Sequence, residues 1–459
     1  MTRYDALIIG SGQAGPFLAA RMAAAGMKVS LIERQHLGGT CVNDGCMPTK
    51  TLVASARAAH MARRAGDFGV KIGGPVSVDM KAVKARKDLI VGQSIDNLTR
   101  WLDGIEGLSV IRGHARFVAS HAIEVDGETL EAPKVFINVG GRAVLPDWPG
   151  LADVPILTNT SMMDLDVLPE HLIVVGGSYI GLEFAQMYRR FGSRVTVVEY
   201  ADRIIAREDE EISLEVQAIL EREGVRFLLG ARDAKVTSAT RGSRVHVALK
   251  TAGAAHEVEG SHLLAAAGRR PNSDELGLDR AGIATDARGF ITVDDELRTN
   301  VPGVWALGDV NGQGAFTHTS YNDHEIVAAN LLDAEHRRTT DRIPAYALFT
   351  DPPLGRVGMT EAQVRATGRP ALVGVMPMSR VGRAKERGET QGFMKVLVDA
   401  QTERILGAAL LCIEGDEIVH SLLDVMAADA SYQVIRRSVH IHPTVSELIP
   451  TLLGSLTPL

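Results

Sequence analysis

Residues 10–15 of the chain read Gly-Ser-Gly-Gln-Ala-Gly, and this stretch decides the fold. A short apolar run at residues 4–10 leads into it, an alanine-rich stretch at 16–25 follows, and a second apolar run occupies 29–33. Strand-length apolar runs on either side of a helix-length stretch predict a β-strand, a tight turn, an α-helix and a second strand. That order is the first βαβ unit of a doubly wound sheet, so we expect an α/β protein.

The same plan occurs a second time along the chain. Residues 176–181 read Gly-Gly-Ser-Tyr-Ile-Gly, with an apolar strand before them and a helix and a strand after them. Each copy closes on an acidic residue 23 positions after its first glycine, from Gly10 to Glu33 and from Gly176 to Glu199. One such loop alone is also compatible with an ordinary glycine-rich turn. Two loops with equal spacing to an acid indicate two dinucleotide sites on one chain.

The chemistry of the two loops follows from backbone geometry. The first glycine permits the sharp turn, the second small residue lets a pyrophosphate approach the main chain, and the third lets the helix pack closely on the strand. The phosphates then lie on the free amides at the helix N-terminus. These positions are Gly10, Gly12 and Gly15 in the first copy and Gly176, Ser178 and Gly181 in the second.

The closing acid of the second copy carries a prediction about the nucleotide. A carboxylate at this position accepts hydrogen bonds from ribose hydroxyls and repels the 2′-phosphate of NADP. Glu199 therefore favours NAD over NADP for the second fold. Arg203 lies close enough in the sequence to accommodate a phosphate, so this preference depends on where its side chain points.

Turn signals and changes of pattern divide the chain into domains. Prolines and glycines cluster at residues 146–155 and again around Pro271, where we expect the chain to cross between domains. From about residue 345 the pattern changes to alternating strands and an amphipathic helix. The predicted division is a first doubly wound domain in two parts at 1–149 and 273–344, a second doubly wound domain at 150–272 and an α+β domain at 345–459.

Composition narrows the classes of function. Of the 459 residues, 45% are hydrophobic and 23% are charged, as in ordinary folded proteins. A net charge of −7 without a block of like charge argues against nucleic acid or an anionic membrane as a partner. No apolar run reaches the roughly 18 residues of a membrane helix, and the N-terminal residues lack a signal-peptide pattern, so we expect a cytoplasmic protein.

Two of the three cysteines lie directly after the first βαβ unit. Cys41 and Cys46 are five residues apart with a glycine between them, so their sulfur atoms can meet. Pro48 suits the first turn of a helix that continues over residues 51–64, which puts Cys46 at or just before a helix N-terminus. The helix dipole and the nearby Lys50 should lower the pKa of the Cys46 thiol and favour the thiolate.

A redox pair is the interpretation that these two cysteines favour. A structural disulfide does not suit a reducing cytoplasm, and a zinc site lacks its third and fourth ligands nearby. Two buried cysteines placed by coincidence would not lie beside a phosphate loop. No metal site is predicted. Cys412 lies inside an apolar strand and is expected to be an inert core thiol.

The cysteine segment resembles a known family motif. Residues 39–50 resemble the active-site motif of the flavoprotein disulfide reductases, the group of dihydrolipoamide dehydrogenase, glutathione reductase and mercuric reductase. Residues 299–309 resemble the second flavin motif of that family, 268–272 its motif between domains, and 442–447 its C-terminal catalytic segment. The resemblance covers essentially the whole chain.

The resemblance implies a cofactor for each fold. The first fold would bind FAD, with Glu33 on the adenosine ribose and Asp309 on the ribityl chain. The second fold would bind the nicotinamide nucleotide, with Tyr179 as a gate over the flavin. Tyr179 is equally compatible with plain packing over the glycine turn. The other cofactor-site positions implied are Gly39, Thr40, Gly140, Gly268 and Arg269.

The resemblance also implies a relay of electrons from NADH through FAD to the cysteine pair. Cys46 would be the thiol that faces the flavin, and Cys41 would be the interchange thiol that attacks the substrate. Lys50 and Glu183 would pair near flavin N5. From the sequence alone, these two charges are also compatible with solvated positions on helices.

A histidine near the C-terminus completes the implied site. His442, oriented by Glu447, would be the acid/base and would come from the second subunit of a homodimer. A disulfide exchange needs a proton donor whose pKa is near ambient pH, and histidine suits that role. Thr444 and Glu447 also fit a helix capping box, and His440 offers an equally suitable imidazole.

The electron acceptor is the least determined part of the prediction. A low-molecular-weight disulfide is the first hypothesis, with lipoamide as one candidate because Glu199 favours NAD. The second is a metal-ion reductase, since residues 12–15, residues 48–50 and Ser178 resemble the mercuric-reductase-like branch. Residues 451–459 contain no cysteine, however, so the C-terminal thiol pair of a mercuric reductase is missing. A third hypothesis is a non-catalytic, redox-sensing flavoprotein subunit.

Overall fold

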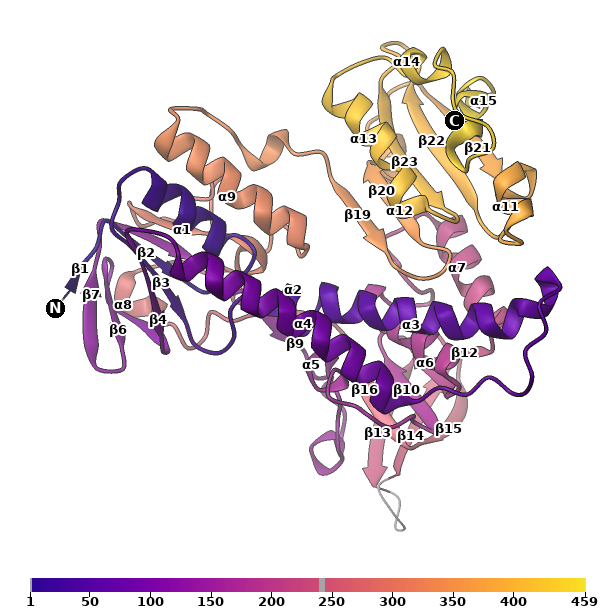
Figure 1. Ribbon diagram of the computed structural model, residues 1–459, viewed down its shortest axis with the longest axis horizontal. Coiled ribbons are helices and arrows are strands. Elements are labelled where there is room, and N and C mark those ends of the chain that lie inside the picture. Colours follow the sequence, from indigo (N-terminus) through magenta and orange to yellow (C-terminus); the bar gives the residue numbers. More distant parts are fainter. Residues whose placement is uncertain (1, 239–243) are drawn as a thin grey trace.

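A computed structural model describes residues 2–238 and 244–459 of the chain (Figure 1). Its N-terminal part contains a sheet of five parallel strands in the spatial order β18-β8-β2-β3-β4. In that order their bounds are Val304–Ala306, Lys134–Ile137, Ala6–Ile9, Val29–Glu33 and Leu108–Arg112. The central strand β2 is an uninterrupted apolar run, as is usual where helices or loops cover both faces of a parallel sheet.

Both predicted βαβ units are present. In the first, β2 and β3 flank α1 (Gly15–Ala24), which carries Pro16 in its first turn. In the second, β10 (His171–Val175) and β11 (Arg194–Val198) flank α6 (Tyr179–Phe191). The second unit belongs to another parallel sheet, β12-β11-β10-β16, which is completed by Val225–Leu228 and His262–Ala265. The predicted α/β class is confirmed.

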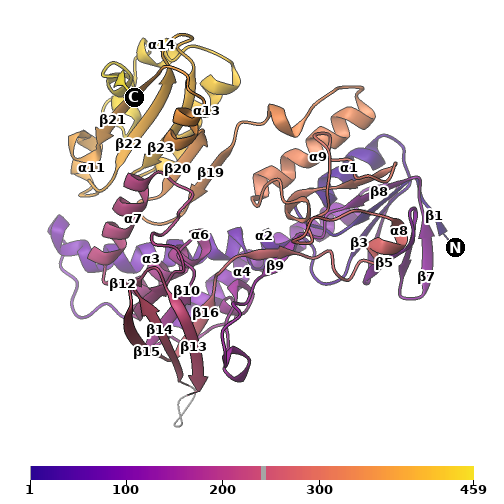
Figure 2. The same ribbon diagram turned by 180° about the vertical axis from the view of Figure 1, so that it is seen from behind.

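A helical segment that only the first unit possesses follows β3. It consists of α2 (Gly39–Asn43), α3 (Cys46–Arg64) and α4 (Met80–Asp103). α3 agrees with the helix that the sequence predicts after the cysteines. Asp79 begins α4, because its carboxylate accepts hydrogen bonds from the amides of residues 81 and 82. α3 and α4 pack on each other and run across the middle of the molecule (Figures 1 and 2).

Short strand pairs, most of them antiparallel, connect and extend the two parallel sheets. β9 (Gly141–Ala143) pairs with β17 (Arg269–Pro271), so the two crossings of the chain between the sheets lie side by side. Two further small sheets are β1-β7-β6-β5, at Thr2–Arg3, Glu128–Glu131, Ala122–Val125 and Ala115–Ala119, and β13-β14-β15, at Arg232–Ser238, Val245–Thr251 and Ala254–Gly260. The remaining helices of this part are α5 (Asn159–Met162), α7 (Glu210–Arg222), α8 (Leu278–Ala281) and α9 (Thr317–Leu332).

The C-terminal part is an antiparallel sheet with short helices. Its strand order is β19-β20-β23-β22-β21-β24, at Ala345–Leu348, Leu354–Gly358, Ile405–Leu411, Phe393–Asp399, Ala371–Pro377 and Thr457–Pro458. The helices are α10 (Glu361–Ala366), α11 (Gly382–Glu386), α12 (Gly415–Ile418), α13 (His420–Ala427), α14 (Gln433–Arg436) and α15 (Ile449–Leu453). This confirms the predicted α+β character of the C-terminal part. The exact boundaries at residues 149, 272 and 344 stay a prediction.

One hydrophobic core is shared between the second parallel sheet, α3 and the C-terminal sheet. Leu52 of α3, Phe184 of α6 and Leu411 of β23 belong to the same cluster of buried side chains. In Figure 1 the C-terminal sheet accordingly lies directly above α3 and α7. The helix that begins at Cys46 is therefore packed against both neighbouring parts of the molecule.

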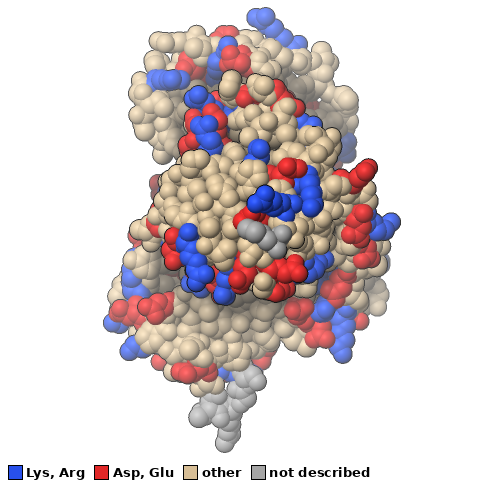
Figure 3. Space-filling view, turned by 90° about the vertical axis from the view of Figure 1, so that its left-hand side faces the viewer, with Lys and Arg blue, Asp and Glu red and all other residues tan. Residues whose placement is uncertain are grey.

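The surface carries charges of both signs. On the face seen in Figure 3, Lys and Arg are interspersed with Asp and Glu in scattered groups, and other residues cover most of the area. This agrees with the small net charge of −7. None of the described helices is both long and apolar enough to span a lipid bilayer.

Candidate active site

A cavity of about 1340 Å³ lies between the N-terminal sheet, α3, α6 and the C-terminal part. Many of the predicted site residues line it. Those lining residues are Gly10, Gly12, Glu33, Gly39, Thr40, Cys41, Cys46, Lys50, Gly140, Tyr179, Glu183, Arg269 and Asp309. The predicted positions that do not line it are Gly15, Gly176, Ser178, Gly181, Glu199, Gly268, His442 and Glu447.

The first glycine loop has the backbone geometry of a phosphate loop. Gly10 has a φ of +95°, and a Cβ atom there would lie 2.4 Å from the carbonyl oxygen of Asn138. A Cβ on Gly15 would lie 2.3 Å from the carbonyl oxygen of Gly10, so the helix can start this close only with glycine. The side chain of Ala14, the residue before α1, cannot cap this helix, which leaves amides of the loop and first turn other than that of Gly15 available to an anion.

Glu33 is fixed at the end of β3, beside this loop. Its carboxylate accepts hydrogen bonds from the amide of Ser11 at 2.9 Å and from the hydroxyl of Ser11 at 2.6 Å. The amide of Gln35 donates to its other oxygen at 2.8 Å. The carboxylate is thus held at the cavity wall, where a ribose bound to this fold would lie.

Asn138 supports the same loop, and sequence reasoning missed it. It follows β8 and lies 4% exposed beneath the loop. Its side-chain oxygen accepts from the amide of Gly15 at 3.0 Å, and its side-chain nitrogen donates to the carbonyl of Leu307 at 2.9 Å. The signal available in the sequence was a polar residue directly after an apolar strand, at the edge where doubly wound sheets bind ligands.

The half-buried carboxylate of Asp309 also lines the cavity. Burial raises the pKa of Asp309, while Arg269, whose Nε lies 3.6 Å away, opposes the rise. Arg269 also donates to the carbonyl of Gly141 and, at 3.4 Å, to the hydroxyl of Thr40. A glycine loop at a helix N-terminus, a fixed Glu33 and the half-buried Asp309 on one large cavity fit the phosphate, ribose and polar chain of a flavin dinucleotide.

The second glycine loop lies outside this cavity except for Tyr179 and Ile180, the first two residues of α6. Glu199 accepts hydrogen bonds from the amides of Gly177 and, at 2.7 Å, Ala201. In the described chain Arg203 forms no hydrogen bond to this carboxylate. Its guanidinium donates instead to the carbonyls of Ala206 at 3.0 Å and Glu208 at 3.3 Å.

The two cysteines differ in their protonation. Cys46 is the first residue of α3, its surface is open to the cavity, and both cysteines are free thiols. A hydrogen bond from Cys41 outweighs burial and, with the hydroxyl of Thr317 at 3.0 Å and the charge of Lys50, lowers the pKa of Cys46 to about 6. The same hydrogen bond and burial raise the pKa of Cys41. Near neutral pH the site therefore holds a Cys46 thiolate beside a Cys41 thiol.

Lys50 and Glu183 form an ion pair across α3 and α6. The distance from Lys50 Nζ to Glu183 Oε2 is 2.7 Å, and the glutamate side chain is only 6% exposed. The centre of the Phe349 ring lies 4.3 Å from Lys50 Nζ. The backbone amide of Phe349 donates to Glu183 Oε1 at 3.1 Å. These contacts exclude the alternative that the two charges are separately solvated.

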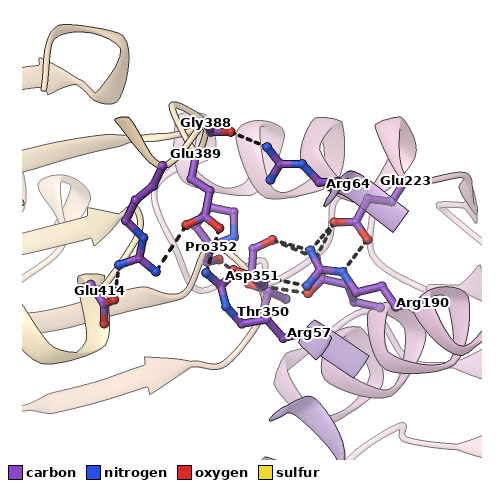
Figure 4. A network of polar contacts seen from close by, with 12 residues as sticks. Arg57, Arg64, Arg190, Glu223, Thr350, Asp351, Pro352, Gly388, Glu389 and Glu414 are labelled. Carbon is purple, nitrogen blue, oxygen red and sulfur yellow. Dashed lines mark hydrogen bonds and ion pairs between the residues drawn. The ribbon is translucent and has the colours of Figure 1, made fainter. Parts of the chain in front are cut away.

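A polar network fixes the segment that carries Phe349. Asp351 accepts hydrogen bonds from Arg57 of α3 at 2.5 Å and from Arg190 of α6, as Figure 4 shows. Gln186 binds the backbone of Asp351 through both its amide and its carbonyl, at 2.8 Å each. Although burial alone would raise the pKa of Asp351, Arg190 and Arg57 lower it. The two helices that begin at Cys46 and Tyr179 are therefore tied to the C-terminal part.

His442 and Glu447 form a pair at the surface of the C-terminal part, away from the cavity. The distance between His442 Nδ1 and Glu447 Oε2 is 2.7 Å, and the histidine side chain is 80% exposed. The hydroxyl of Thr444 donates to the carbonyl of Ile441, so the capping-box alternative does not describe this segment. His440 contacts the carbonyl of Ser446. Within the described chain, His442 does not reach the cysteines.

Comparison with known proteins identifies the family of this chain. Residues 4–323 match the family described as pyridine nucleotide-disulphide oxidoreductase, and residues 344–453 match the dimerisation domain of the same family. The chain belongs to this family of enzymes. The resemblance noted in the sequence is thereby confirmed.

Within the family, several proteins are similar over nearly the full chain. The probable pyridine nucleotide-disulfide oxidoreductase RclA of Escherichia coli is 37% identical over 99% of both chains. A mercuric reductase of Streptomyces lividans is 35% identical over 99% of this chain and 97% of the relative. A dihydrolipoyl dehydrogenase of Cupriavidus necator is 34% identical over 97% and 96%.

A solved structure agrees with the fold. The Cu(II) complex of the HOCl-induced flavoprotein disulfide reductase RclA from Escherichia coli superposes with a TM-score of 0.89 at 36% identity, covering 99% of both chains. The family and this likeness define the chain as similar to a flavoprotein disulfide reductase with a redox-active cysteine pair and a dimerisation domain.

Proposed function

We propose that this protein is an FAD-dependent NADH oxidoreductase that reduces a small disulfide through Cys41 and Cys46. The observation that carries the proposal is the position of Cys41 and Cys46, which lie at and just before the N-terminus of α3 on the wall of the cavity that they share with the first glycine loop. When bound, FAD would take a hydride from NADH and pass the electron pair to the cysteine disulfide. The first glycine loop, Glu33 and Asp309 would hold it.

The chain's own residues then perform thiol–disulfide exchange. Two electrons open the disulfide and leave Cys46 as a thiolate, stabilised by Thr317 and Lys50. Cys41, once deprotonated, attacks an external disulfide, forms a mixed disulfide and expels one substrate thiolate, which takes up a proton. The Cys46 thiolate next attacks the Cys41 sulfur, expels the second substrate thiolate and restores the internal disulfide.

A second subunit would supply the proton carrier. The raised pKa of Cys41 means that a base is needed before this thiol can attack. His442 has the right chemistry but faces outward in its own chain, beside the exposed apolar residues Val439 and Ile441. An imidazole at an apolar surface of a dimerisation domain supports a homodimer in which His442 of each copy serves the other copy's cavity.

NADH is the nucleotide that we propose for the second fold. Glu199 is held by two backbone amides, so its carboxylate faces the glycine loop and would meet a 2′-phosphate with like charge. The arginine that left the preference open in the sequence, Arg203, donates to backbone carbonyls instead.

Reduction of a metal ion is the second candidate function. The similar RclA structure is that of a Cu(II) complex, and the mercuric reductase of Streptomyces lividans is 35% identical over 99% of this chain. Thiolates are suitable ligands for soft metal ions, so Cys41 and Cys46 could accept one.

The proposal is tested with purified holoprotein. One equivalent of NADH under anaerobic conditions should reduce the cysteine disulfide, leave the flavin oxidised and produce a long-wavelength charge-transfer band. Cys46→Ser should abolish this band, and Cys41→Ser should show it without NADH. A band that persists in Cys46→Ser would reject the assignment of the two thiols.

A steady-state panel then separates the candidate acceptors. NADH or NADPH is combined with lipoamide, glutathione disulfide, other small disulfides, Cu²⁺ and Hg²⁺. Turnover with a disulfide supports the first function, and turnover with a metal ion alone supports the second. No turnover, together with a stoichiometric protein that co-purifies with the chain, would favour a non-catalytic flavoprotein subunit.

A further inference from the structure

Two tyrosine hydroxyls converge on one buried carboxylate beside the cavity. Tyr179 donates to Glu208 Oε1 at 2.8 Å, and Tyr346 donates to the same oxygen at 2.7 Å. Tyr179 begins α6, whereas Tyr346 lies on β19 of the C-terminal part. Glu208, at 2% exposed, comes from the loop between β11 and α7. The carboxylate thus joins the second glycine loop to the C-terminal part.

The carboxylate keeps its place independently of Tyr179. Its other oxygen lies 3.1 Å from Nε of Arg356, a side chain of β20 that is 1% exposed. Arg356 also pairs with Asp209 at 3.0 Å. A charged acceptor with a buried arginine on one side and Tyr346 on the other remains in position when Tyr179 moves.

The ring of Tyr179 rests against other aromatic rings but is not enclosed by them. It meets Tyr346 edge-on, with ring centres 5.8 Å apart, and Phe316 edge-on at 6.3 Å. Tyr346 and Phe316 are themselves stacked at 5.4 Å. These three rings line the cavity that also contains Cys46. The hydrogen bond to Glu208 is therefore a specific polar contact on a ring whose other contacts named here are apolar.

We propose that Glu208 is a positioning residue that latches Tyr179 in its closed position and so opposes nucleotide binding. The inference rests on the proposed function and on the role that the family resemblance implies for Tyr179, a gate over the flavin where a nicotinamide would stack. A nicotinamide can reach that place only after the Tyr179 ring swings aside, and the swing breaks its hydrogen bond to Glu208. The free energy of nucleotide binding is therefore less favourable by the contribution of this hydrogen bond.

The loss is large enough to measure. A hydrogen bond to a charged group changes an equilibrium by roughly 10- to 100-fold. The bond forms again when the ring returns, because Arg356 and Tyr346 hold the carboxylate meanwhile. The latch consequently weakens nucleotide affinity and favours release of the oxidised nucleotide after hydride transfer.

Tyr179→Phe isolates the latch, since it removes the hydroxyl and leaves the ring. The readouts are the Kd of NAD⁺ for oxidised holoprotein by calorimetry and the KM for NADH. We expect Kd to fall by about tenfold or more, given that the acceptor is charged. Tyr346→Phe is the matched control, because it removes an identical bond to the same oxygen without releasing Tyr179. The control should bind NAD⁺ no more tightly than wild type.

The possible outcomes distinguish a failure of the latch proposal from a failure of the proposed function. If NADH reduces the wild-type flavin but Tyr179→Phe binds NAD⁺ with wild-type affinity, the latch is wrong and the proposed function stands. Equal tightening by both variants also overturns the latch. If NADH does not reduce the wild-type flavin, both proposals fail. Should Tyr179→Phe not retain FAD, Glu208→Gln must tighten NAD⁺ binding in its place, because a neutral amide is a weaker acceptor.

Discussion

Thr317→Val should raise the pKa of Cys46 by about one unit. The hydroxyl of Thr317 lies 3.0 Å from the Cys46 sulfur and is one of three groups that lower this pKa to about 6, with Cys41 the largest and Lys50 the third. A hydrogen bond to a charged acceptor contributes about 1.5–3 kcal/mol, and 1.36 kcal/mol corresponds to one pKa unit. We take the lower end because sulfur is a weak acceptor. Removing a donor that stabilises the thiolate favours the thiol, so the pKa rises.

The consequence at neutral pH is a smaller thiolate fraction. With a pKa of about 6, roughly 90% of Cys46 is ionised at pH 7, and with a pKa near 7 about half is. The assay is the rate of iodoacetamide alkylation of reduced protein between pH 4 and 9, with mass spectrometry to assign the site. The pH at half-maximal rate reports the pKa of Cys46 directly, whether or not NADH is present.

A matched control is available on the same helix. Thr319→Val changes the same residue type two positions along α9, and in the described chain Thr319 forms no hydrogen bond to either cysteine. It should leave the alkylation profile unchanged. An unchanged profile in Thr317→Val, or the same shift in both variants, would refute the assignment of Thr317 as a thiolate donor.

Three further perturbations follow from the same geometry. His442→Ala should leave reduction of the flavin by NADH intact and slow disulfide turnover, and an equal mixture with Cys41→Ser after subunit exchange should regain activity; no recovery would contradict a shared site. Asp351→Asn should destabilise the fold by about 3 kcal/mol, since it leaves Arg57 and Arg190 without their carboxylate, measured by urea unfolding. Because the pKa of Asp351 is lowered in the folded chain, its contribution is present at neutral pH and is lost as the pH falls below about 4. Glu199→Ala should reduce the ratio of kcat/KM for NADH to that for NADPH, and an unchanged ratio would reject Glu199 as the selecting residue.

The features that the sequence could predict are those encoded by short spacing. The paired glycine loops predicted two parallel sheets, and Pro48 with the stretch after it predicted the helix that begins at Cys46. Each of these depends on residues within about 25 positions of one another. Local backbone rules are sufficient for them.

The contacts that tune the site could not be predicted, because they join distant segments. Thr317 reaches Cys46 across 271 positions, and Tyr346 reaches Glu208 across 138. Thr317, Tyr346 and Asn138 have no local pattern that marks them as functional. The choice between a capping box and a histidine–carboxylate pair at Glu447 also required coordinates, since both use residues at the same spacing.

The ties between α3, α6 and Asp351 have a practical consequence for chimeras built from relatives. An exchange of the C-terminal part near residue 344 would bring in a foreign loop at 349–351 while keeping the native Arg57 and Arg190. Any mismatch there would displace the backbone amide of Phe349, which binds Glu183. The disturbed contact would then be the Lys50–Glu183 ion pair and not a contact at the junction itself. Recombinants should therefore inherit Arg57, Arg190 and Asp351 from a single parent.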